Sequence, residues 1–193
     1  MPNWTPMDRR LWTEHDFIAG DPCLDFINTV GDTGKTRTQE HLVDAQALDE
    51  WALARGLLSP DEAPASSSQE LAAALTLREG LHAFFASIAR GEADALAWEA
   101  VRGDLAAALA VSQLVKPSRG TLTAPRMPER LALAALALLH DGRLARLKEC
   151  GRCNWLFLDQ SKARRRQWCR TEVCGNRARV ERHYRKRHGL ELT

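Results

Sequence analysis

The chain has no hydrophobic run long enough to cross a lipid bilayer. Its longest strongly apolar segment, Leu131 to Leu139, has nine residues, whereas a membrane-spanning helix needs about 20. The first ten residues contain no apolar segment of the kind found in a secretory signal. We therefore expect no membrane partner and a cytoplasmic location.

Features of common enzyme sites are also missing. The 193-residue sequence contains no internal repeat and no glycine-rich phosphate-binding loop. No Ser/His/Asp, Cys/His or paired-carboxylate arrangement is brought together by its spacing. We therefore do not expect an enzyme. The length suits one domain with a sizeable core and a small additional module.

The chain does contain two close pairs of cysteines near its end. Fifteen residues separate Cys150 and Cys153 from Cys169 and Cys174. Such pairs can bind one Zn²⁺ per chain through four thiolates, which completes the coordination and makes the site structural. The alternative is four unrelated thiols or two disulfides, and disulfides are rare in a reducing compartment. The fifth cysteine, Cys23, is predicted to be a small buried apolar group.

Charge is strongly divided along the chain. Residues 143–193 contain fifteen Lys or Arg and five Asp or Glu, whereas residues 1–142 contain twelve basic and twenty acidic residues. A small basic module creates a positive field that attracts polyanions, and nucleic acid is the obvious one. The alternative is that the basic segment docks on the acidic part of its own chain or of a partner subunit.

Apolar periodicity predicts a mostly helical N-terminal region. Ser67 and Glu70 have the spacing of a capping box at a helix start. A short hairpin is expected within residues 111–123, around Pro117 and Gly120. The predicted helices, which together suffice for a bundle core, cover residues 41–58, 67–91, 93–109 and 128–142.

Three polar residues interrupt an apolar segment at residues 17–31. These residues are Asp25, Asn28 and Thr29. A buried polar group without a partner costs about 1–3 kcal/mol, so each must form local hydrogen bonds or line a cavity. Local bonding at a helix end is one interpretation, and a pocket for a small-molecule ligand is the other.

The zinc module is predicted to contain a hairpin. Residues 155–158 suit one strand, and residues 164–169 suit the returning strand. The aromatic residues Trp155, Phe157 and Trp168 are expected to pack over the metal, because so small a unit has few other core residues. Metal binding supplies about 10 kcal/mol or more in such modules, so the segment is expected to unfold without zinc.

A basic helix is predicted from Gly175 to Arg187. Val180 and Tyr184 lie one turn apart and are expected to face the hairpin. Guanidinium groups on another side of the helix would then be free to contact phosphates or base edges. The predicted nucleic-acid contacts are Arg164, Arg165, Arg166, Arg177, Arg179, Arg182, Arg185 and Lys186.

These motifs are similar to two known families. The C-terminal motifs resemble those of the CGNR zinc-finger family. They are Cys150-x-x-Cys153, Trp155-Leu-Phe-Leu-Asp159, Arg165-Arg-x-Trp-Cys169 and Cys174-Gly-Asn-Arg177. The segments Gly20-x-x-x-Leu24-Asp-Phe-Ile-Asn-Thr29 and Leu48-x-x-Trp51 resemble the ABATE domain, which commonly precedes that finger. One departure is Arg170-Thr-Glu-Val after the third cysteine, where the resemblance places a small residue and methionine.

The expected fold is therefore mainly α with a small α+β zinc module. A helical ABATE-like domain at residues 1–145 precedes a treble-clef-like finger, a hairpin plus a helix, at residues 146–193. The resemblance implies a bacterial, stress-responsive transcription regulator whose N-terminal domain senses a small ligand and whose finger binds DNA. RNA binding through stacking on Trp155 or Trp168 is one alternative. Docking of the finger on an acidic protein partner is another.

Overall fold

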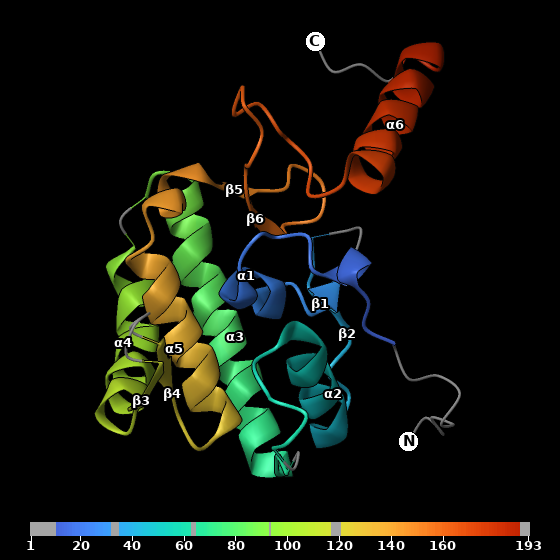
Figure 1. The fold of residues 1–193 in the computed structure, drawn as a ribbon. Helices are drawn as coiled ribbons and strands as arrows, with labels where there is room; N and C mark the ends of the chain where they lie inside the picture. The colour runs from blue at the N-terminus through green and yellow to red at the C-terminus, as the bar shows by residue number, and fades with distance from the viewer. Residues whose placement is uncertain (1–10, 32–34, 63–64, 93, 117–120, 190–193) are drawn as a thin grey trace.

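The molecule is built around three long helices that pack side by side (Figure 1). The computed structural model describes residues 11–31, 35–62, 65–92, 94–116 and 121–189. Two shorter helices lie against the longest one, α3, so the predicted helical N-terminal region is confirmed. The helices of this region are α1 (Pro22–Ile27), α2 (Ala45–Arg55), α3 (Ser68–Ala89), α4 (Ala95–Ala110) and α5 (Met127–Leu139), preceded by the 3₁₀ turn η2 (Glu14–Asp16).

The helix starts follow from side-chain caps in the sequence. The predicted capping box at α3 is present, because Ser67 Oγ accepts a hydrogen bond from the Glu70 amide and the Glu70 carboxylate accepts one from the Ser67 amide. Asp94 caps α4 through the Ala97 amide. Such caps satisfy amides that a helix start leaves unpaired.

The helix predicted at residues 41–58 is shorter in the structure. It is preceded by strand β2 (Gln39–Glu40), which pairs antiparallel with β1 (Val30–Gly31). The Asp44 carboxylate accepts a hydrogen bond from the Ala47 amide and begins α2 after the strand. Helix α1 was not predicted, because it has only six residues and a helical period cannot be recognised over so short a span.

The hairpin expected near residues 111–123 is confirmed. Strands β3 (Gln113–Lys116) and β4 (Thr121–Thr123) pair antiparallel, with a register shift between Leu114 and Lys116. The predicted turn residues Pro117 and Gly120 lie outside the described residues.

The hairpin of the zinc module pairs differently from the prediction. Strand β6 (Leu156–Leu158) pairs with β5 (Leu147–Glu149), and residues 164–169 form no strand. Lys148 explains the difference, because its Nζ donates to the carbonyl oxygens of Arg164 at 2.6 Å and Arg166 at 3.2 Å. The returning segment is therefore held as an irregular loop, and Arg164 has a left-handed φ of 50° that interrupts an extended chain.

The helical region and the zinc module share one hydrophobic core. All three residues of β6 are buried, and the strand contacts both α1 and α3. The same buried cluster includes the four C-terminal cysteines and Trp51. The division at residues 145 and 146 stays a prediction, and the packing makes the stability of each part depend on the other.

The last helix extends away from this core (Figure 1). Helix α6 (Asn176–Arg187) has no buried residue. The expectation that Val180 and Tyr184 face the hairpin is wrong, because they are 68% and 57% exposed. The module also contains the 3₁₀ turn η4 (Gly142–Arg146) and the π-helical turn η5 (Thr171–Gly175), which leads directly into α6.

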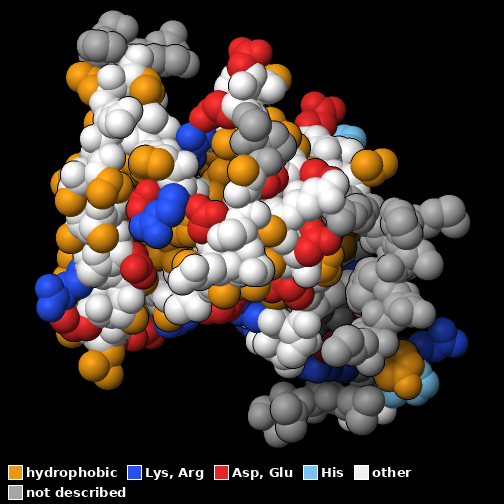
Figure 2. Space-filling model, turned by 90° about the horizontal axis from the view of Figure 1, so that it is seen from below, with side chains coloured by type: hydrophobic (Ala, Val, Ile, Leu, Met, Phe, Trp, Pro, Cys, Tyr) orange, Lys and Arg blue, Asp and Glu red, His pale blue; other side chains and the backbone are white. Residues whose placement is uncertain are grey.

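Acidic side chains are spread over the described part of the face turned away from the finger (Figure 2). This distribution agrees with the acidic composition of residues 1–142. No helix in the described ranges has both the length and the hydrophobicity needed to span a membrane.

Candidate zinc centre and nucleic-acid interface

Four cysteine sulfurs converge beneath the start of α6. The Sγ atoms of Cys150, Cys153, Cys169 and Cys174 all lie within 4.8 Å of one another, and all four residues are buried. The Cys153–Cys169 and Cys169–Cys174 distances are 3.4 and 3.5 Å. A tetrahedron with Zn–S bonds of about 2.3 Å has edges of about 3.8 Å, so the cluster has the size and donor set of a Zn²⁺ site.

Three structural elements deliver the cysteines. Cys150 and Cys153 lie in the turn between β5 and β6, where the Cys150 amide donates to the Trp155 carbonyl at 2.8 Å. Cys169 ends the irregular loop, and Cys174 lies in η5. The Gly151 amide donates to the Gln167 carbonyl at 3.2 Å, which fastens the first turn to the loop.

The four thiols are so close together that they cannot all ionise without a cation. Hydrogen bonds from Cys153 and Cys169 lower the pKa of Cys150, aided by the backbone amides of Cys169 and Arg152. The reciprocal contact with Cys150 raises the pKa of Cys153 to about 12 and raises that of Cys169 further. Burial raises the pKa of Cys174. A divalent ion among the sulfurs provides the charge that lets all four lose their protons.

Trp168 is wedged between the two cysteine turns. A Cβ added to Gly151 would lie 3.0 Å from Trp168 Cζ3, and one added to Gly175 would lie 3.1 Å from Cδ1. The indole therefore packs directly on the backbone of both turns, and a methyl group at either glycine would force the ring to move by a few tenths of an ångström.

The sequence Cys-Gly-Asn-Arg at residues 174–177 has a separate structural role at each position. Cys174 provides a sulfur, and Gly175 leaves room for Trp168. Asn176 Nδ2 donates to the Glu172 carbonyl at 2.8 Å and fixes the turn that begins α6. Arg177 is exposed and lines a cleft beside the cysteines.

A buried carboxylate fastens the loop that precedes Cys169. Asp159 is fully buried and accepts hydrogen bonds from Lys148 Nζ at 2.7 Å and from the Ser161 and Arg166 amides at 3.0 Å. Burial raises the pKa of Asp159, but the hydrogen bonds from Lys148 and Ser161 outweigh it, so the pKa lies well below its usual value. This structural role of Asp159 was not predicted, because its partner Lys148 is eleven residues away.

Arg166 differs from the other predicted nucleic-acid contacts because its guanidinium group forms hydrogen bonds within the protein. Its Nε donates to the Trp168 carbonyl at 2.9 Å, and a second guanidinium nitrogen donates to the Cys169 carbonyl. Its guanidinium also lies over the Phe157 ring, 4.5 Å from the centroid. The side chain therefore holds the zinc loop against the hairpin.

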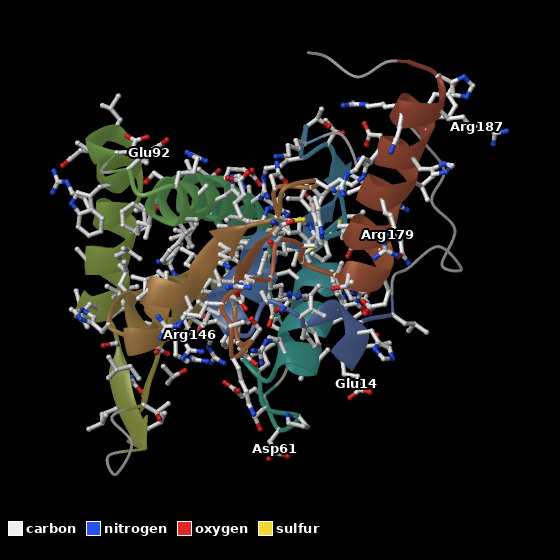
Figure 3. The ribbon with its side chains drawn as sticks, turned by 90° about the horizontal axis from the view of Figure 1, so that it is seen from above. Glu14, Asp61, Glu92, Arg146, Arg179 and Arg187 are labelled. Carbon is white, nitrogen blue, oxygen red and sulfur yellow. The ribbon has the colours of Figure 1, made fainter. Side chains whose placement is uncertain are left out.

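The remaining seven predicted contacts lie on the loop and on α6. Arg164 and Arg165 lie on the loop, and Arg177 lies at the start of α6. Arg179 lies farther along the helix, and the helix ends at Arg187 (Figure 3). Arg182, Arg185 and Lys186 occupy the rest of α6, where no residue is buried.

A carboxylate inside α6 restrains part of this surface. Glu181 pairs with Arg185 at 2.7 Å and also with Arg152 in the first cysteine turn. The second ion pair ties the projecting helix to the zinc centre. Arg152 was not predicted as a functional residue, because its partner lies 29 residues away in a different element.

The three polar residues predicted to line a ligand pocket all have protein partners. Asp25 accepts from the Ala19 amide at 3.0 Å and from Arg55 Nε at 2.8 Å. Thr29 donates to the Phe26 carbonyl at 2.8 Å. Asn28 contacts β6 of the zinc module instead of its own segment. A ligand here would have to share or displace these bonds, and ligand binding at these residues stays a prediction.

Comparison with known protein families agrees with this architecture. Residues 20–142 match the ABATE family, described as a putative stress-induced transcription regulator. Residues 146–187 match the CGNR zinc finger, so the four clustered cysteines are its zinc site. Both descriptions are of regulatory or metal-binding families rather than enzymes. The comparison with curated proteins found no match.

Proposed function

Because the chain belongs to the ABATE family and ends in a CGNR zinc finger, we propose that it is a transcription regulator whose finger binds duplex DNA. The observation that carries this proposal is that helix α6 is positively charged and has no buried residue. The helix has twelve residues, of which six are Lys or Arg and one is Glu, and none of the twelve is buried. A helix with no packing role and this charge is suited to a polyanion.

The dimensions of the finger fit a DNA groove. Twelve helical residues extend about 18 Å, and a major groove about 12 Å wide admits a helix. The zinc centre fixes one end of α6, while Arg164 and Arg165 on the preceding loop add positive charge to the same module. Several phosphates of one duplex can therefore be contacted at once.

RNA binding has less support from the structure. Its sequence argument relied on stacking by Trp155 or Trp168, and both rings are only partly exposed. Trp155 Nε1 donates to the Val30 carbonyl at 2.9 Å, and Trp168 is packed between two glycines. Among the described residues of the finger, Tyr184 is the exposed aromatic ring that could stack on a base, and it already contacts His188.

Docking of the basic helix on the acidic part of its own chain is also weakly supported. The ion pairs of α6 among the described residues join Glu181 to Arg185 and to Arg152, all within the zinc module. The described ion pairs between residues 143–193 and residues 1–142 run in both senses. Arg143 of η4 is paired with Asp21 at 3.6 Å, and Glu149 of β5 is paired with Arg90, at the end of α3, at 3.1 Å. Neither of these two pairs involves α6. The basic surface of α6 is thus available to an external partner.

The N-terminal region is hydrogen-bonded directly to the finger through Asn28. If a small ligand acts at Asp25, Asn28 and Thr29, as we propose for the sensor function, Asn28 would transmit the change because it is bonded to β6. A ligand can alter DNA affinity only to the extent that it binds the two states of this contact differently.

The test is the salt dependence of DNA binding. Fluorescence anisotropy of a labelled duplex measures the affinity at each salt concentration, and single-stranded RNA is added as a competitor. Six phosphate contacts predict a log–log slope of about −5. The double substitution Arg179→Ala and Arg182→Ala should flatten the slope by about one unit per lost contact. Arg102→Ala, which removes an exposed charge from α4, is the control and should leave the slope unchanged.

Three outcomes would contradict the proposal. An unaltered slope in the double variant would move the contact surface away from α6. Preference for the single-stranded RNA over the duplex would make the finger an RNA-binding module. If neither nucleic acid binds at low salt, an acidic protein partner becomes the better explanation of the basic helix.

A further inference from the structure

A cleft of about 220 Å³ lies between the β1–β2 hairpin and the zinc centre. Gly31 and His41 form part of the wall on the N-terminal side, and Trp155 forms part of the wall on the finger side. The remaining wall on the finger side includes Arg152 and Arg170, together with Arg177. The cleft therefore contains residues from both halves of the chain and does not include Asp25, Asn28 or Thr29.

The cleft has an excess of hydrogen-bond donors. The guanidinium groups of Arg170 and Arg177 form no hydrogen bond or ion pair with any residue that the structure describes. Arg152 is paired with Glu181, but its Nε is buried and has no acceptor within the described ranges. None of the described lining residues is Asp or Glu, but three of them, Cys153, Cys169 and Cys174, belong to the zinc site, where their thiolate charge is shared with the metal. A buried donor without an acceptor is costly, and an anion in the cleft would provide one.

The shape and chemistry of the cleft restrict what can bind. Guanidinium groups bind planar or tetrahedral oxyanions through paired hydrogen bonds, so carboxylates and phosphates are the matching groups. The volume lies below the range of about 300–1,000 Å³ found for drug-sized ligands, which indicates a smaller molecule. Trp155 and Val173 supply an apolar part of the wall against which the rest of such a molecule could lie.

We propose that this cleft binds a small molecule carrying a carboxylate or phosphate, with its oxyanion held between Arg170 and Arg177. The ligand contacts the β1–β2 hairpin on one side and the zinc finger on the other. Its binding therefore favours one placement of the finger relative to the N-terminal region. The regulatory consequence depends on the proposed DNA-binding function, whereas the binding itself does not.

The experiment is isothermal titration of the zinc-loaded full chain, without DNA, with benzoate and separately with inorganic phosphate. Sodium chloride at equal ionic strength corrects for screening. We expect saturable binding of at least one of the two anions, at one site per chain. Arg170→Gln and Arg177→Gln should each weaken it by about tenfold or more, because each removes charged hydrogen bonds.

Two matched variants sharpen the test. Lys162→Gln removes one exposed positive charge from the same module outside the cleft and should bind the anion as the wild type does. Arg170→Lys keeps the charge but loses the paired geometry, so it should give intermediate affinity. Zinc content and circular dichroism of every variant show whether the finger is still folded.

Three results would overturn the proposal. Equal weakening in Lys162→Gln would mean that the anion responds to general charge and not to the cleft. The wild type could fail to bind either anion while the Arg170 and Arg177 variants lose zinc. The two arginines would then serve to neutralise the negative charge of the zinc-bound thiolates. A flatter DNA salt slope in these variants, again without anion binding, would assign the cleft to a DNA phosphate. Since the titration contains no DNA, its failure and failure of DNA binding are separate findings.

Discussion

Asn28 and Leu156 form a reciprocal pair of hydrogen bonds although 128 residues separate them. Asn28 Nδ2 donates to the Leu156 carbonyl at 2.8 Å, and the Leu156 amide donates to Asn28 Oδ1 at 3.0 Å. The side-chain amide therefore pairs with strand β6 as a neighbouring strand would. Both residues are buried, so no water replaces these bonds. This contact joins the end of α1 to the hairpin of the zinc finger.

Replacing this amide should destabilise the whole chain. Asn28→Ala leaves the amide and carbonyl of Leu156 buried without these partners, and we expect a loss of about 2–4 kcal/mol in the free energy of unfolding. Urea denaturation of the zinc-loaded protein measures it. Gln46→Ala, which removes a side chain bonded to Glu50 at the surface, should change the value by less than about 0.5 kcal/mol.

Protease resistance of the finger shows whether Asn28 couples the two parts of the chain or stabilises only its own surroundings. If Asn28 links the two parts, the variant should also expose the finger to protease in its zinc-bound form. Destabilisation confined to residues 11–62, with the finger still resistant, would contradict the interpretation that the contact couples the two parts.

Local signals allowed much of the fold to be predicted. The capping box at Ser67, the long apolar stripe of α3 and each close pair of cysteines depend on residues a few positions apart. The pairing of β5 with β6 could not be predicted in this way, because it depends on where Lys148 fastens the carbonyls of a distant loop. An apolar strand looks the same in sequence whichever partner it takes.

The candidate site shows the same division. The zinc ligands followed from spacing and thiol chemistry. The arginines could not be sorted by spacing, because Arg165 and Arg166 are adjacent in sequence yet one is exposed and the other bonds to the loop carbonyls. The cleft was not predicted either, since its walls come from residues more than a hundred positions apart.

Zinc content should depend on the four C-terminal cysteines alone. Metal analysis should give about one zinc per chain. Cys169→Ser or Cys174→Ser should release the metal and open the finger to proteolysis, whereas Cys23→Ser, a buried cysteine outside the cluster, should do neither. Because β6 lies in the shared core, metal loss should also lower the stability of the helical region. A metal-free protein with a protease-resistant segment 146–187 would contradict this prediction.

The packing of Trp168 predicts that an added methyl group is harmful at one glycine and harmless at another. In Gly151→Ala the new Cβ would lie 3.0 Å from the indole, so we expect a loss of about 1–3 kcal/mol. Gly103→Ala, in α4 with no atom within 4 Å, should instead stabilise the helix by about 0.5–1 kcal/mol. Urea midpoints and competition with a zinc chelator measure both effects. Equal behaviour of the two variants would show that the indole is not a structural wedge.

The stability of the N-terminal region should depend on pH through Asp25. Burial raises the pKa of this carboxyl to about 6, although the Ala19 amide and Arg55 oppose the shift. Since the folded pKa exceeds the unfolded value of about 3.9, the folded state binds the proton more tightly. The stabilising contribution is thus full below the unfolded pKa and is lost as the pH rises through about 6. Between about pH 5 and 8 the loss should be about 1.4 kcal/mol.

Asp25→Asn removes this titration while keeping an oxygen that can accept the Ala19 amide. The variant loses the Arg55 ion pair at every pH, so the informative quantity is the difference in unfolding free energy between wild type and variant as a function of pH. Acid release of zinc acts on both proteins and cancels in that difference. We expect the wild type to lose its advantage over the variant as the pH rises from about 5 to 8. A difference that stays constant, or grows with pH, would mean that the carboxyl is ionised throughout and that Arg55 outweighs its burial.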